Sequence, residues 1–94
     1  MTTAQEAFSI SNQGAGTYPF TLKIGGLYQF AVVATFGGGS VKIENLGPDG
    51  STWLSVSSAI VANGGETDNL PPGAYRFNVA TATAVYARVA RIPQ

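Results

Sequence analysis

The sequence contains no cysteine and no histidine among its 94 residues. The first absence excludes disulfide bonds, and the second removes the commonest transition-metal ligand and the commonest general base. Nucleophilic catalysis of the Ser-His-Asp or Cys-His kind is therefore excluded in its usual form. A fold this small needs another source of stability, and we expect a homo-oligomer or docking on a larger partner to supply it.

Charge is also scarce in this chain. Only 11% of the residues are charged, and five basic residues balance five acidic ones, whereas soluble proteins average about 25% charged residues. The missing basic excess argues against a nucleic-acid partner. No apolar run approaches the roughly 18 residues of a membrane helix, and the first ten residues lack the features of a signal peptide. We expect a protein made in the cytoplasm, with no membrane partner and with much of its surface covered by protein; the alternative is a monomer of low charge.

What the chain does have is short segments in which apolar and polar residues alternate, with no stretch at helical period. The expected strands cover residues 7–11, 17–24, 27–36, 40–46, 52–57, 74–80 and 85–92, and residues 58–61 are expected to form a further short strand or a loop. This pattern predicts an all-β fold, a small antiparallel β-sandwich of seven or eight short strands, with a jelly roll as the candidate topology. We expect residues 1–6 to form a flexible N-terminal arm and residues 7–94 a single β-sandwich domain.

Several local features lead to finer expectations. Residues 27–56 are predicted to form three successive strands at the centre of one sheet, after a hairpin loop at Gly25-Gly26. Both faces of residues 27–36 are mostly apolar, so we expect both to be covered. Pro19 cannot donate a ladder hydrogen bond, which favours an edge strand for residues 17–24. Residues 66–69 are expected to form an acidic loop.

No candidate for catalysis or metal binding stands out. No two of the acidic residues are marked as a pair held across a cleft, as a glycosidase requires; these residues are Glu6, Glu44, Asp49, Glu66 and Asp68. The acidic segment lacks the spacing of a calcium loop, and the three glycines at 37–39 lack the lysine of a phosphate-binding loop. We therefore predict no enzyme activity, no metal and no cofactor.

Four residues are candidates for a partner interface: Trp53, Tyr86, Arg88 and Arg91. A lone tryptophan in a small β-domain belongs either to the core or to an interface, where aromatic residues are enriched. The two arginines near Tyr86 on the last strand are either rim contacts to a partner or charges that block edge pairing. A third interpretation is a sugar-stacking platform built from Trp53 and exposed tyrosines.

Two phrases resemble a known family. They are GPDGSTW at residues 47–53 and LPPGAYRFNVATATAVYARVARIP at residues 70–93. They are similar to segments of small accessory virion proteins of tailed bacteriophages, of the head decoration or cement type. The resemblance covers about the last half of the chain and carries over no residue of a defined site. It implies a sandwich or jelly-roll domain, made in the host cytoplasm, that forms oligomers on the capsid exterior.

In that interpretation the partner is the major capsid protein or another virion protein, and the role is to strengthen subunit junctions. Two alternatives stay open. One is a carbohydrate- or receptor-binding β module, and the other is a structural component of the tail or baseplate.

Overall fold

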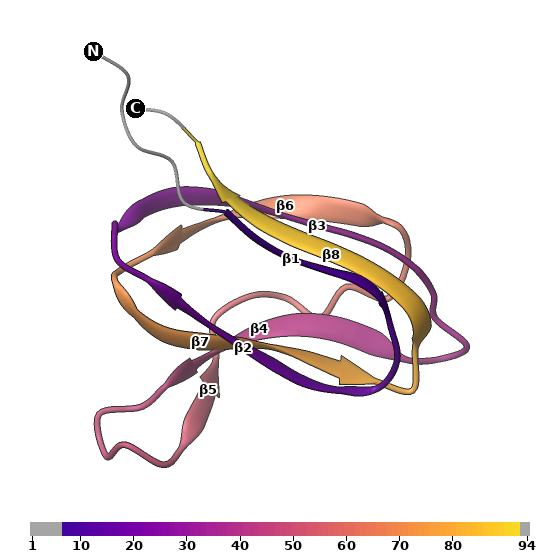
Figure 1. The fold of residues 1–94 in the computed structure, drawn as a ribbon, viewed down its shortest axis with the longest axis horizontal. Coiled ribbons are helices and arrows are strands. Elements are labelled where there is room, and N and C mark those ends of the chain that lie inside the picture. Colours follow the sequence, from indigo (N-terminus) through magenta and orange to yellow (C-terminus); the bar gives the residue numbers. More distant parts are fainter. Residues whose placement is uncertain (1–6, 93–94) are drawn as a thin grey trace.

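The structure is a computed structural model that describes residues 7–92. This part of the chain forms eight antiparallel strands: β1 (Ala7–Gln13), β2 (Gly16–Leu22), β3 (Gly26–Thr35), β4 (Ser40–Leu46), β5 (Trp53–Ser55), β6 (Gly64–Leu70), β7 (Gly73–Ala80) and β8 (Thr83–Arg91). They make two four-stranded sheets, sheet A with the order β1-β8-β3-β6 and sheet B with the order β2-β7-β4-β5. The two sheets pack as the layers of a sandwich (Figure 1). This strand order is that of a jelly roll, which confirms the predicted fold class.

Successive strands mostly cross from one sheet to the other. Within residues 7–92, β4 and β5 are the one pair of consecutive strands that hydrogen-bond to each other, and their hairpin extends away from the sandwich (Figure 1). The expectation that residues 27–56 form the centre of one sheet is therefore wrong, because β3 lies in sheet A while β4 and β5 lie in sheet B. Gly25-Gly26 likewise connects the two sheets and does not close a hairpin. Alternation defines which face of a strand is buried, but it does not select the neighbouring strand.

Strand β6 lies where the sequence predicted an acidic loop. Residues 64–70 pair antiparallel with β3. In this pairing Glu66 lies opposite Phe30, and Asp68 lies opposite Tyr28. Residues 58–61, expected to form a short strand or a loop, make an isolated bridge between Ile60 and Val41. The prediction failed because the inward positions of β6 carry carboxylates. Inward-pointing charges on an edge strand are a known protection against pairing with another chain.

The core fills the space between the two sheets. Phe20 contacts three aromatic rings in it, with its ring centroid 5.3 Å from that of Phe8, 5.7 Å from Tyr75 and 4.9 Å from Phe77. Every second side chain along three strands is buried, as a period of two requires, at positions 28, 30 and 32, at 75, 77 and 79, and at 85, 87 and 89. Each large apolar side chain buried in this way contributes about 1.5–3 kcal/mol. The edge position predicted for the strand around Pro19 is also confirmed.

Three strands begin with the same tripeptide pattern, Gly-x-Tyr. The glycines have φ values of 148°, 146° and 155°, a region that residues with a Cβ rarely adopt, at Gly16, Gly26 and Gly73. Each tyrosine hydroxyl donates to the backbone carbonyl four residues earlier: Tyr18 to Gly14, Tyr28 to Ile24 and Tyr75 to Pro71. These bonds tie the turn before each strand to the strand itself, so the pattern sets where β2, β3 and β7 start.

The glycine run at residues 37–39 makes the turn from β3 to β4. Gly39 N donates to the carbonyl of Phe36 at 2.7 Å. A Cβ on Gly39 would lie 1.9 Å from the carbonyl oxygen of Ala80, so no larger residue fits there without moving the backbone.

Within residues 7–92 no helix is long and apolar enough to cross a membrane.

Candidate functional site

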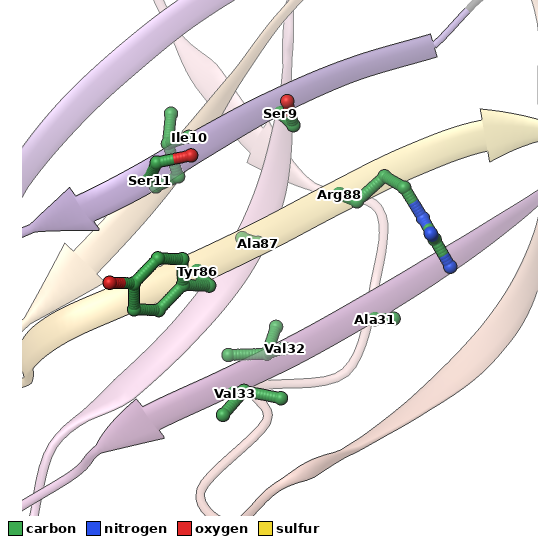
Figure 2. Close-up of a pocket in the computed structure, with 9 residues that line it drawn as sticks. All are labelled: Ser9, Ile10, Ser11, Ala31, Val32, Val33, Tyr86, Ala87 and Arg88. Atoms are coloured by element: carbon green, nitrogen blue, oxygen red, sulfur yellow. The ribbon is translucent and has the colours of Figure 1, made fainter.

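The outer face of sheet A carries a shallow hollow of about 290 Å³. Its lining comes from β1, β8 and β3, and consists of Ser9, Ile10, Ser11, Ala31, Val32, Val33, Tyr86, Ala87 and Arg88. Figure 2 shows Tyr86 and Arg88 on β8, on either side of Ala87. We call this place the sheet A hollow.

Strand alternation explains which side chains meet there. Because Val85, Ala87 and Val89 are buried in the core, Tyr86 and Arg88 must point outward from β8. In the sheet register Tyr86 lies opposite Val33, and Arg88 lies between Ser9 on one neighbouring strand and Ala31 on the other. Because Ser9 and Ala31 are small, the surface of the sheet is recessed beside Arg88.

The hollow exposes apolar surface. Tyr86 is 51% exposed and Val33 is 56% exposed, although they face each other on neighbouring strands. The prediction that both faces of residues 27–36 are covered is therefore wrong for the single chain. Exposed apolar side chains that lie next to each other make this face a candidate for binding another molecule.

Electrostatically, Arg88 is isolated. Its Nη2 donates to Gln29 Oε1 at 3.4 Å, which is a long hydrogen bond. Within residues 7–92 it forms no ion pair, and the other outward positions of sheet A are uncharged. A guanidinium has five N–H donors, so most of its binding capacity stays available to a partner.

The outer face of sheet B is arranged differently. Glu44 is only 6% exposed, and its Oε1 accepts from Arg76 Nε at 2.7 Å, while Lys42 Nζ lies 3.5 Å from its Oε2. Burial raises the pKa of Glu44, but the hydrogen bonds from Arg76 and Asn78 and the two nearby positive charges outweigh it, so the net pKa is lowered. Lys42 also donates to Ser55 Oγ at 3.0 Å. These charges are matched within the chain.

The structure separates the four predicted interface residues. Tyr86 and Arg88 meet at the sheet A hollow. Trp53 lies on sheet B, half-buried, with the Arg76 guanidinium carbon 4.3 Å from its ring centroid. Arg91 has the same strand parity as Val89, and its Nε donates to the carbonyl of Gly25 at 3.3 Å. It therefore packs on the connection between β2 and β3, away from the hollow.

Two acidic side chains, Glu66 and Asp68, lie on the inner side of β6, where the sequence analysis predicted a loop. Glu66 Oε2 accepts from Ser58 N at 3.2 Å, and Asp68 Oδ2 is buried with no hydrogen-bond partner among residues 7–92. Burial, together with the hydrogen bond and the charge of Glu66, raises the pKa of Asp68 to about 7. The sequence did contain a sign of this strand, because Glu66, Asp68 and Leu70 occupy alternate positions and so share one face. In the described part of the chain, no three acidic side chains cluster closely enough to hold a metal ion.

The chain is thus a jelly-roll sandwich, and the outer face of its sheet A exposes apolar side chains and one arginine that has no ion pair within residues 7–92. No protein-family model matches the sequence, and the comparison with curated proteins gave no match. Among solved structures, the Yersinia pseudotuberculosis-derived mitogen is similar, with a TM-score of 0.50 and 13% identity. The match covers 97% of this chain and 87% of the mitogen chain. At this identity the likeness supports the β-sandwich fold alone.

Proposed function

We propose that this chain is a non-enzymatic structural protein of a bacteriophage virion, a decoration or cement protein that binds the head exterior and stabilises the junctions between capsid subunits. The observation that carries the proposal is the open face of sheet A, with Tyr86 and Val33 exposed and one charge unmatched. The partner is the major capsid protein or another virion protein, and the chain self-associates on the capsid surface.

Three further points support this function. Jelly rolls are common in viral capsid domains. The phrases at residues 47–53 and 70–93 resemble accessory head proteins of tailed phages. A chain with 11% charged residues suits a surface that is covered after assembly. Many weak contacts, repeated at every equivalent position of a shell, add up to firm attachment by multivalency.

The test is to locate the protein in purified particles. Particles of the virus that encodes the chain are separated into heads and tails, and each fraction is analysed by mass spectrometry. We expect the protein in the head fraction, and we expect heads stripped of it to rebind the recombinant chain. Its absence from particles contradicts the proposal, while its presence in tails alone assigns it to the tail or baseplate.

A second candidate is a carbohydrate-binding module, favoured by one observation. The sheet A hollow combines an exposed tyrosine ring, an arginine and two serine hydroxyls, which are groups that bind sugars. Its volume of about 290 Å³ is at the lower end for small-molecule sites, which typically measure about 300–1,000 Å³ and enclose most of the ligand. An open hollow of this size suits a protruding side chain better than a bound sugar.

A further inference from the structure

The sheet A hollow has a definite charge preference. Arg88 is the one charged side chain among the outward positions of sheet A in the described residues, and its single hydrogen bond, to Gln29, is long at 3.4 Å. The acidic side chains of β6, Glu66 and Asp68, occupy the inner positions opposite Phe30 and Tyr28. The face thus presents a cation and no anion.

The surroundings of Arg88 are suited to desolvation by a partner. Tyr86 and Val33 supply apolar surface two residues away along β8 and on the neighbouring strand β3. Ser9 and Ala31, directly opposite Arg88, are too small to cover it. Figure 2 shows the arginine side chain extending from β8 toward β3, and Arg88 is exposed to solvent. Arginine and tyrosine are enriched among residues that dominate binding energy at protein interfaces.

We propose that the head protein seats a carboxylate side chain against Arg88, with the aliphatic stem of that side chain on Tyr86 and Val33. A carboxylate pairs with a guanidinium through two parallel hydrogen bonds, which adds orientation to attraction. Because the net charge of the chain is zero, this local pair, and not a long-range field, selects the partner. The inference rests on the proposed function and names the partner group at its contact face.

The first test compares two charge reversals in binding to stripped heads. R88E reverses the charge in the hollow, and K23E makes the same change of net charge at an exposed position between β2 and β3. We expect R88E to weaken binding at least tenfold and K23E to change it less than twofold, because losing one member of an interface charge pair raises the dissociation rate. The difference should shrink as salt is raised.

The second test traps the pair directly. R88K places an amine in the hollow, and a carbodiimide then joins that amine to a touching carboxylate as an amide, with the lost water taken up by the carbodiimide. We expect mass spectrometry to find a cross-link from position 88 to an aspartate or glutamate of the head protein. Lys23 and Lys42, both still present in R88K, serve as internal controls.

The outcomes separate this inference from the function on which it rests. If the unaltered chain binds heads, but R88E and K23E bind equally well and no cross-link forms at position 88, the inference is wrong and the proposed function stands. If the unaltered chain binds no heads, both are wrong. If R88E keeps full head binding but loses binding to acidic sugars that the unaltered chain retains, the hollow is a sugar site and the inference is again wrong.

Discussion

The outer faces of the two sheets treat their polar groups in opposite ways. On sheet B, Arg76 and Lys42 both pair with Glu44, and the Arg76 guanidinium lies over the Trp53 ring. On sheet A, Arg88 has one long hydrogen bond, and the apolar groups beside it are exposed. Charges that are satisfied within the chain stabilise the fold, whereas a charge left open is available to a partner. From this comparison we propose a structural role for the outer face of sheet B and a recognition role for that of sheet A.

The largest effect that tests this comparison is expected on sheet B. Arg76→Ala removes the closest partner of Glu44, whose side chain is only 8% exposed, and leaves Lys42 at 3.5 Å. We expect the free energy of unfolding to fall by about 2–3 kcal/mol, because a buried carboxylate that loses its ion-pair partner is poorly compensated. Urea denaturation at pH 7 measures this change.

The matched control is Arg88→Ala on sheet A. Its guanidinium is exposed and has no ion pair within residues 7–92, so we expect a stability change below about 0.5 kcal/mol. Head binding should respond in the reverse order. Arg88→Ala should bind heads more weakly, whereas Arg76→Ala that has folded should bind them as the unaltered chain does. Equal losses of stability from the two variants contradict the division between the faces.

The next effect is a pH dependence of stability, with opposite signs in the two sheets. The native pKa of Asp68, raised to about 7, exceeds its ordinary value of 3.8. Between those values the native state holds a proton that the unfolded chain has lost, so stability decreases as pH rises from about 4 to about 7 and then levels off. Asp68→Asn removes this penalty. Because part of this side chain meets solvent, we expect a gain of only about 1 kcal/mol at pH 8, and little change near pH 4.

Glu44→Gln provides the contrasting variant. Its lowered pKa means that the native ion pair contributes stability above the ordinary value of 4.5, and that this contribution is lost as pH falls through the native pKa. Glu44→Gln should therefore be most destabilising near neutral pH and least so in acid. Thermal unfolding from pH 3 to pH 8 records both variants. If Asp68→Asn is less stable than the unaltered chain at pH 8, the raised pKa of Asp68 does not destabilise the native state as we expect.

The sequence was sufficient to predict the buried face of most strands but not their partners. Alternation at positions 28, 30 and 32 and at 75, 77 and 79 identified the core correctly. It could not show that β3 and β4 belong to different sheets, because that choice depends on contacts between segments far apart in the chain. Strand β6 was missed for another reason, since its inward positions carry Glu66 and Asp68 where apolar residues were expected.

For the candidate site, the structure brings Tyr86 and Arg88 together and places the other two predicted residues, Trp53 and Arg91, elsewhere. Tyr86 and Arg88 are two residues apart on one strand, so alternation alone puts them on one face. Arg91 has the opposite parity, a signal that was present in the sequence, and it packs on Gly25. Trp53 could not be placed from its own strand, because the face it covers is defined by Arg76 on β7. The isolation of Arg88 became visible only when both neighbouring strands were known.

The smallest expected effect concerns Trp53 on sheet B, which we compare with Tyr86 on sheet A. A cation over an aromatic ring at a partly exposed position contributes about 0.5–1 kcal/mol, and the Arg76 guanidinium lies 4.3 Å from the Trp53 centroid. Trp53→Leu should lower the free energy of unfolding by about 0.5 kcal/mol in urea denaturation and leave head binding within twofold. Tyr86→Ser, on the other sheet, should leave stability nearly unchanged and weaken head binding. If Trp53→Leu weakens head binding as much as Tyr86→Ser does, the recognition surface includes the β4–β5 hairpin, and sheet B has more than a structural role.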